Sequence, residues 1–140
     1  MGGRWIRDAA RLSAAGMLAA GLCAALIEPA ARAYTPEQVA AGGQVYTQSC
    51  AGCHGARGEG AGPDDPEAPL LIGPRGLTGF RHVLELYEFT RDSMPQDQPG
   101  SLSAEQYWNV TAWLVSQNGI PSPGGPLGPE NAASIPLARR

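Results

Sequence analysis

The sequence predicts an all-α fold with three main helices and long loops. Three segments carry apolar side chains at helical spacing: one that begins at Pro36, one over residues 80–92 and one that begins after Gly100. No segment shows the alternation of a strand, and neither an internal repeat nor a second domain is visible. Residues 34–119 are therefore expected to form one helical domain, followed by an extended tail over the proline- and glycine-rich residues 120–140.

The first helix has a clear start signal, and one of its faces carries two glycines. Thr35 is a suitable N-cap, Pro36 suits the first helical position, and Gln38 completes a capping box. Gly42 and Gly43 then fall inside the helix, where each glycine costs about 1 kcal/mol relative to alanine. We therefore expect another element to pack very close to this face.

The second and third helices are bounded by equally local signals. Pro95 ends the second helix, expected over residues 80–92, because proline disfavours helical geometry in the residue before it. Ser103 and Gln106 form a second capping box at the start of the third helix. Asn118 and Gly119 supply the stop signal at its end.

Between the first two helices the chain reads Cys-Ala-Gly-Cys-His. Cys50 and Cys53 lie on one helical turn and point to the same side, so both thiols can form thioethers with one porphyrin edge while His54 turns onto the iron. This pattern predicts one covalently attached haem c. A thioredoxin-like dithiol would need a βαβ setting, and a zinc site would need two further ligands, for which only Cys23 and His82 remain.

A glycine- and proline-rich loop over residues 55–79 follows the motif. A loop of this length is uncommon in a compact domain unless it wraps around something, and a haem fits this role, with the apolar residues 69–72 as a wall. Asp64, Asp65 and Glu67 raise the alternative of a calcium site, but they lack the EF-hand spacing. A solvated loop tip is the favoured interpretation.

Residues 1–33 have the pattern of a secretory signal peptide. Arginines near the start precede the 16-residue apolar run Leu12–Ile27, and small residues at Ala31 and Ala33 fit a cleavage site before Tyr34. The run is shorter than the roughly 20 residues that span a bilayer. We therefore expect cleavage and export to the periplasm. Retention as an N-terminal membrane anchor is the alternative, and membrane association is expected only in that case.

The charge of residues 34–140 limits the partners. This part of the chain holds six arginines, eleven acidic residues and no lysine, a net charge of −5. A nucleic-acid partner is not expected, because its phosphates are bound by clusters of positive charge. Electrostatic steering should instead favour a basic or neutral docking surface on the partner.

Residues 36–119 resemble the class I cytochromes c. The resemblance rests on the Cys-x-x-Cys-His motif, the Ala-Pro-Leu-Leu step at 68–71, the pair Met94-Pro95 and a last helix that bears an aromatic residue. It implies a class I cytochrome c fold wrapped around one covalently bound haem. The stretch 94–108 is most similar to bacterial periplasmic cytochromes that accept electrons from dehydrogenases.

The resemblance also implies a role for several individual residues. Gly42 and Tyr46 would face Trp113 where the first and last helices cross. Pro69 would offer its carbonyl oxygen to the His54 ring, which would be the proximal iron ligand. Leu71 would line the haem pocket beside it.

The distal iron ligand has three alternatives: Met94, His82 or no ligand. Met94 is the single methionine after the signal segment, and it lies 40 residues beyond His54, which matches the axial position of the family. His82 lies near a helix start next to Arg81, and a surface position is expected for it. We therefore expect Met94 to bind the iron.

These expectations together describe an electron carrier rather than an enzyme. An iron with both axial positions filled binds oxygen or peroxide poorly and exchanges single electrons instead. The expected donor is a periplasmic dehydrogenase, and the expected acceptor is a terminal oxidase or another cytochrome. The alternatives are a haem-based ligand sensor, a small peroxidase that would use His82, and a cytochrome subunit tightly bound in a larger oxidoreductase.

Overall fold

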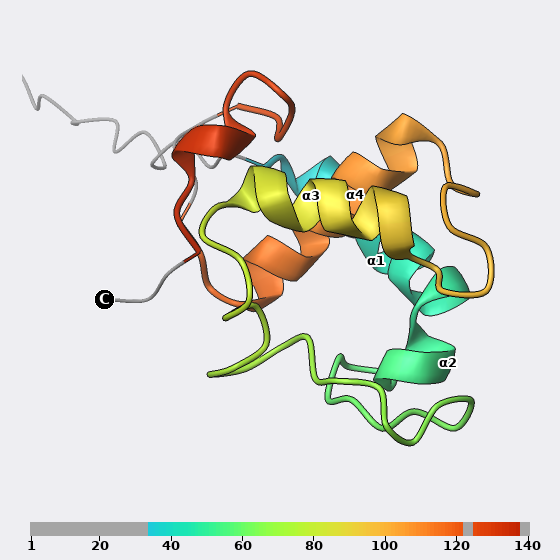
Figure 1. Ribbon diagram of the computed structural model, residues 1–140. Coiled ribbons are helices and arrows are strands. Elements are labelled where there is room, and N and C mark those ends of the chain that lie inside the picture. The colour runs from blue at the N-terminus through green and yellow to red at the C-terminus, as the bar shows by residue number, and fades with distance from the viewer. Residues whose placement is uncertain (1–33, 122–124, 138–140) are drawn as a thin grey trace, which may run out of the picture.

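The computed structural model describes residues 34–121 and 125–137, and within these ranges it is helical (Figure 1). The predicted signal peptide lies outside the described residues. The elements are α1 (Pro36–Ser49), α2 (Ala51–His54), α3 (Val83–Ser93), α4 (Ala104–Gln117) and the 3-10 turn η1 (Ala132–Ser134). No strand is present among the described residues, so the predicted all-α class is confirmed. In this part of the chain, no helix combines the length and the apolar character needed to cross a membrane.

Both capping boxes form as predicted. At the start of α1, the Gln38 amide donates to Thr35 Oγ1 over 3.2 Å, and the Gln38 side chain accepts from the Thr35 amide over 3.4 Å. At the start of α4, Ser103 and Gln106 make the same pair of bonds over 3.2 and 2.9 Å. These bonds satisfy amides that the first helical turn leaves unpaired, so each helix begins where the sequence predicts.

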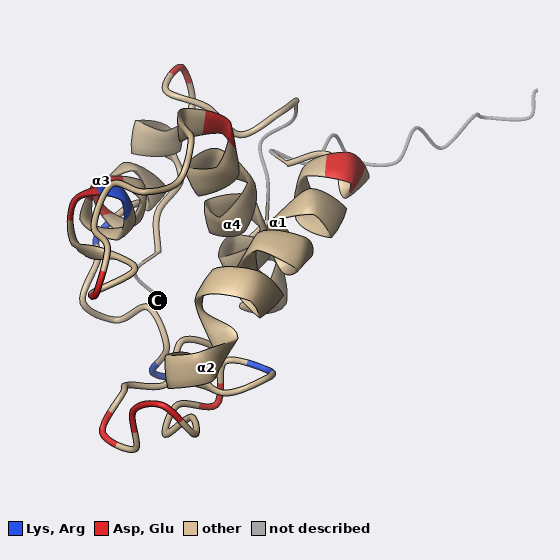
Figure 2. Ribbon diagram, turned by 90° about the vertical axis from the view of Figure 1, so that its right-hand side faces the viewer, with Lys and Arg blue, Asp and Glu red and all other residues tan. Residues whose placement is uncertain are grey.

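Helices α1 and α4 cross at the glycine face that the sequence predicts (Figure 2). A Cβ atom at Gly42 would overlap the Asn109 carbonyl oxygen of α4 and would lie 2.8 Å from Trp113 Cβ. Tyr46 stacks on Trp113 with ring centroids 4.1 Å apart. The absence of a side chain at Gly42 therefore lets the two helix backbones come into contact, and the stacked Tyr46 and Trp113 rings pack beside that contact.

The start of α3 differs from the sequence prediction. The helix begins at Val83, three residues later than predicted, and His82 precedes it in an extended conformation. The Val83 amide donates to the Ile135 carbonyl over 3.0 Å, and the Leu137 amide donates to the Arg81 carbonyl over 2.9 Å. In a helix that began at Phe80, the Val83 amide and the Arg81 carbonyl would form hydrogen bonds within the helix. Here both groups bond to the C-terminal segment instead, so the helix begins later.

The C-terminal segment also differs from the expected extended tail. Leu127, Ala132, Ile135 and Leu137 are all buried in the same apolar cluster as α3 and α4. Gln38 of α1 fixes the segment further, because its side chain exchanges two hydrogen bonds with the Leu127 backbone, over 3.0 and 2.8 Å. Proline and glycine exclude a long helix here, but the apolar side chains between them still gain by burial.

Candidate haem-binding site

The Cys-x-x-Cys-His motif forms a single helical turn directly after α1. The Cys50 amide still bonds to the Tyr46 carbonyl over 2.9 Å, and the His54 amide bonds to the Cys50 carbonyl over the same distance. Both cysteines are free thiols; Cys50 is half-buried and Cys53 is exposed. The His54 side chain lies inside, with 9% of the residue exposed. One turn therefore presents two thiols near the surface and one buried imidazole.

The loop after the motif is fastened to this turn. Three of its amides bond to the last three carbonyls of the turn, which α2 leaves without helical partners. A Cβ atom at Gly62 would lie only 2.6 Å from the Cys53 carbonyl oxygen, so the loop can approach this closely only with glycine there. The bonds are Gly60 to His54 (2.8 Å), Gly62 to Cys53 (2.7 Å) and Asp64 to Gly52 (2.9 Å).

This attachment brings Pro69 to the histidine. His54 Nδ1 lies 2.9 Å from the Pro69 carbonyl oxygen, as the family resemblance implies. Because a carbonyl oxygen can only accept, Nδ1 carries the proton and donates, which leaves Nε2 with the lone pair that a metal ligand needs. Pro69 is held in turn by its neighbours: the Ala61 amide bonds to the Ala68 carbonyl over 2.9 Å, and the Leu71 amide bonds to the Gly58 carbonyl over 2.8 Å.

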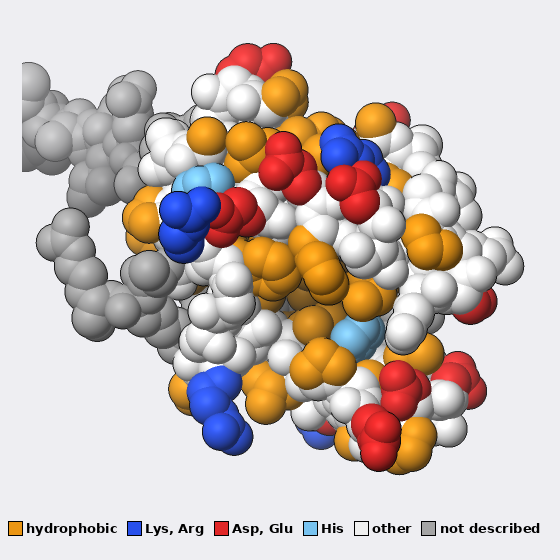
Figure 3. All heavy atoms as spheres, in the orientation of Figure 1, with side chains coloured by type: hydrophobic (Ala, Val, Ile, Leu, Met, Phe, Trp, Pro, Cys, Tyr) orange, Lys and Arg blue, Asp and Glu red, His pale blue; other side chains and the backbone are white. Residues whose placement is uncertain are grey.

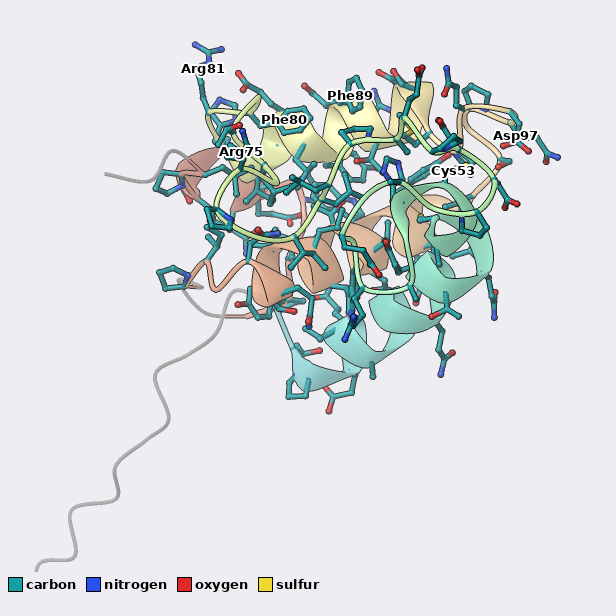
Figure 4. The ribbon with its side chains drawn as sticks, turned by 90° about the horizontal axis from the view of Figure 1, so that it is seen from below. Cys53, Arg75, Phe80, Arg81, Phe89 and Asp97 are labelled. Carbon is teal, nitrogen blue, oxygen red and sulfur yellow. The ribbon has the colours of Figure 1, made fainter. Side chains whose placement is uncertain are left out.

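Apolar side chains surround a hollow next to this turn. Figure 3 shows them gathered between α3 and the loop that follows α2, with a histidine at the edge of the hollow. Leu71 is half-buried and packs against both apolar clusters of the protein. Phe89 of α3 is 46% exposed and lies against Phe80 with ring centroids 5.4 Å apart. In Figure 4 these two rings and Cys53 lie along one side of the molecule.

Asn118 at the end of α4 holds the Leu71 wall in place. Its Nδ2 donates to the Leu71 carbonyl over 3.0 Å, and its Oδ1 accepts from the Gly73 amide over 3.1 Å. The sequence marks this position only as a helix stop. Nothing in the sequence near Asn118 indicates a contact with Gly73 or Leu71, which lie 45 and 47 positions earlier in the chain.

The two candidate distal ligands lie at opposite ends of α3. Met94 is half-buried at the C-terminal end, where its amide bonds to the Thr90 carbonyl over 3.0 Å. His82 is the N-cap at the other end, and its Nε2 lies 3.6 Å from Glu85 Oε1. The 11 residues between them span about 16 Å, so both side chains cannot serve the same position. Met94 as the iron ligand stays a prediction.

The Cys50 thiol does not have the lowered pKa of a redox-active cysteine. Burial, with a smaller effect from Cys53, raises the pKa of the Cys50 thiol to about 11. Redox-active cysteine pairs have a lowered pKa, because the thiolate is the nucleophile. Across residues 34–121 and 125–137, no three His, Cys, Asp or Glu side chains are grouped so that they could hold a metal ion by themselves.

Residues 37–114 match the model of a protein family described as cytochrome c oxidase, cbb3-type, subunit III. The chain belongs to this family. It is a cytochrome c electron-transfer domain with the class I fold, and its cofactor is a covalently bound haem c. The match spans nearly all of α1, the Cys-x-x-Cys-His turn, the loop, α3 and most of α4, so it includes both cysteines, His54, Pro69 and Met94.

Two similar proteins carry names that refer to sulfur compounds. A thiosulfate dehydrogenase of Stutzerimonas stutzeri is 33% identical over 82 residues, which are 56% of this chain and 27% of that protein. The crystal structure of the sulfane dehydrogenase SoxCD from Paracoccus pantotrophus contains a chain with a TM-score of 0.58 and 26% identity. That likeness covers 76% of this chain and 60% of the other. This cytochrome thus spans only about a quarter of the first relative and three fifths of the second.

The residues at the site fit a covalently bound haem c. Cys50 and Cys53 are both free and lie on the same turn, and His54 has its ring orientation fixed by the Pro69 carbonyl. Apolar side chains from α3 and the loop line the adjoining hollow. When bound, the haem supplies an iron that gains and loses a single electron. Cys50 and Cys53 would hold it through their two sulfurs, and the Pro69 carbonyl orients the His54 imidazole that would face the iron.

Proposed function

We propose that this protein is an exported monohaem cytochrome c that receives single electrons from a dehydrogenase and passes them to a further redox protein. The observation that carries the proposal is the His54–Pro69 hydrogen bond of 2.9 Å beside two free cysteines on one turn. With the haem attached, this arrangement commits the imidazole to the iron and both thiols to thioethers, so none of the three is left as an acid–base or nucleophilic group for a substrate. The protein itself is not an enzyme in this account.

The axial ligands of the proposed carrier are His54 and Met94. With both positions filled, no open site remains for oxygen, peroxide or a signalling gas, which separates a carrier from a sensor or a peroxidase. Two observations support Met94 over His82. The Met94 backbone is held at the end of α3, whereas the His82 backbone is bound up in the bridge to the C-terminal segment. His82 also lies close to Glu85, at 3.6 Å.

Reduced inorganic sulfur compounds are the proposed source of the electrons. Support comes from the names of two similar proteins, a thiosulfate dehydrogenase and a sulfane dehydrogenase. Both names describe oxidation of sulfur in a low oxidation state, which must deliver its electrons to an acceptor. The domain described above is suited to accept them one at a time.

A fixed subunit of a larger oxidoreductase is the second candidate. The likeness to a chain of the sulfane dehydrogenase SoxCD favours it, because the similar chain extends beyond this domain. In this alternative the haem serves one catalytic partner permanently. The two candidates share the same site chemistry and differ only in how long the partner stays bound.

The function is tested with the tagged protein, isolated from its native host with any bound partner. Thiosulfate is added to the oxidised material, and haem reduction is followed by absorption. We expect rapid reduction with the partner fraction present and none with the cytochrome alone. A partner that remains bound through gel filtration identifies a subunit, and one that dissociates identifies a shuttle.

Two outcomes would contradict the proposal. Reduction of the isolated cytochrome by thiosulfate, at the same rate as in the complete fraction, would make the chain itself the enzyme. Binding of carbon monoxide to the reduced protein at micromolar concentration, without prior perturbation, would indicate an open iron and therefore a sensor.

A further inference from the structure

We propose that the Tyr107 hydroxyl is a positioning group that holds the Met94 segment in place and thereby limits displacement of Met94 by external ligands. The proposal rests on the ligation of iron by Met94 that is part of the proposed function. Tyr107 lies in the first turn of α4 and is 1% exposed. Its hydroxyl donates to the Met94 backbone carbonyl over 2.8 Å.

The Met94 backbone is pinned from both sides. Its amide bonds to the Thr90 carbonyl of α3 over 3.0 Å, and its carbonyl accepts from Tyr107 of α4. Met94 itself is extended, with φ −127° and ψ 149°, so its carbonyl has left the helical ladder and needs another donor. The phenol supplies that donor from a helix 13 residues further along the chain.

The segment after Met94 has little else to hold it. Among the described residues, positions 95–101 make hydrogen bonds only within two local turns, Gln98 to Pro95 (2.9 Å) and Ser101 to Gln98 (3.2 Å). Residues 96–101 are all exposed. An open hollow of about 440 Å³ lies between this segment and the helix ends, and Tyr107, Pro99 and Leu102 contribute to its lining. The segment therefore has room to move without disturbing the core.

These facts make the Tyr107 bond specific to the ligated state. When the segment moves away from the haem, the Met94 carbonyl is hydrated, so water replaces the hydrogen bond from Tyr107. When the segment is in place, the carbonyl lies against a buried phenol that is its donor. Removal of the hydroxyl thus raises the free energy of the ligated state alone, and it shifts the population toward the displaced one.

The test measures the affinity of the ferric holoprotein for imidazole, which competes with Met94 for iron. Tyr107→Phe keeps the ring and removes one neutral hydrogen bond, so we expect imidazole to bind about three- to tenfold more tightly. The weak red-end absorption band of sulfur–iron ligation should also be lost at a lower temperature than in the unmodified protein. Global stability is measured alongside by urea unfolding.

Tyr34→Phe is the matched control. Its hydroxyl likewise donates to a backbone carbonyl, that of Ile120, over 2.8 Å, but at the start of α1, away from Met94. We expect this variant to bind imidazole as the unmodified protein does, whatever stability it loses. Unchanged imidazole affinity in Tyr107→Phe would overturn the proposal. So would an equal gain in both variants in proportion to their loss of global stability.

A failure of the underlying ligand assignment is recognised separately. If the unmodified ferric protein lacks the sulfur band and binds imidazole without competition, Met94 is not the ligand, and the proposal falls with that assignment. If the band is present and only the Tyr107→Phe result is negative, Met94 ligation stands and the role of Tyr107 is refuted.

Discussion

Replacement of Gly42 by alanine should weaken the crossing of α1 and α4. The new methyl group would overlap the Asn109 carbonyl oxygen, lie 2.5 Å from the Asn109 carbonyl carbon and 2.8 Å from Trp113 Cβ. Two of these atoms belong to the α4 backbone and cannot rotate away, so the helices must separate. Overpacking of this kind costs about 1–3 kcal/mol, and separation also loosens the Tyr46–Trp113 stack, worth about 0.5–1.5 kcal/mol.

Helix propensity offsets part of this loss. Alanine is about 1 kcal/mol more favourable than glycine inside a helix, so the net destabilisation by Gly42→Ala is expected to be about 1–3 kcal/mol. Gly43→Ala is the matched control with the same gain in propensity. Its methyl group would meet only the Trp113 indole, at 3.2 Å, and this side chain can shift slightly.

The assay is urea unfolding of the ferric holoproteins, followed by far-UV circular dichroism. If the variants share the same dependence of unfolding free energy on urea (the m-value), the difference in midpoint concentration multiplied by that m-value gives the difference in free energy of unfolding. Gly42→Ala should unfold well below the unmodified protein, and Gly43→Ala should unfold near it or slightly above. If Gly42→Ala is as stable as Gly43→Ala, the close approach of the two backbones is not what demands glycine.

Three further predictions concern attachment, pH and charge. Cys50→Ala or Cys53→Ala should lower the yield of holoprotein, because each removes one thioether; haem content per protein measures this. Burial raises the pKa of Tyr46 to about 12, from an unfolded value near 10. Between pH ~10 and pH ~12 the unfolded state therefore binds fewer protons than the folded state, so the free energy of unfolding falls as pH rises. The stability that Tyr46 contributes is complete below pH ~10 and is lost toward pH ~12. Tyr46→Phe should therefore flatten the dependence of stability on pH in this range. Asp64 and Asp65 lie in the loop after α2, where Figure 2 shows acidic residues, and the Asp64 amide bonds to the carbonyl of Gly52, the neighbour of exposed Cys53. Oxidation by anionic ferricyanide should therefore speed up a few-fold as ionic strength rises from roughly 10 to 150 mM, because screening weakens repulsion.

Each of these predictions has an outcome that would contradict it. A folded, haem-free protein from the double cysteine variant would show that the haem is not needed to complete the core. An unchanged alkaline profile in Tyr46→Phe would show that another group causes the loss of stability. For the charge prediction, the Asp64→Asn, Asp65→Asn variant should show a weaker salt dependence than the unmodified protein. Equal dependence in both would mean that the reagent approaches elsewhere.

The parts of the fold that the sequence predicts well depend on neighbours within one helical turn. The starts of α1 and α4 follow from capping boxes whose partners are three residues apart, Thr35 with Gln38 and Ser103 with Gln106. The close crossing at Gly42 was indicated by the cost of a glycine inside a helix, because such a cost needs a compensating contact.

The features that the sequence does not predict depend on residues far apart in the chain. The start of α3 is shifted because its first amide pairs with Ile135, more than fifty residues later. In the site, the His54–Pro69 bond could be predicted only through the family resemblance. The Tyr107 contact with Met94 was missed, although a buried tyrosine needs a partner for its hydroxyl, and that need is the signal that points to it.

The absorption spectrum of the ferric protein, recorded beside that of Met94→Ala, tests the central claim most directly. The claim is that His54 and Met94 both bind the iron of one haem c, which makes the domain a single-electron carrier. The account predicts a weak red-end band from sulfur ligation in the unmodified protein and its loss in Met94→Ala. Absence of the band from the unmodified protein, or its persistence in the variant, would contradict the account.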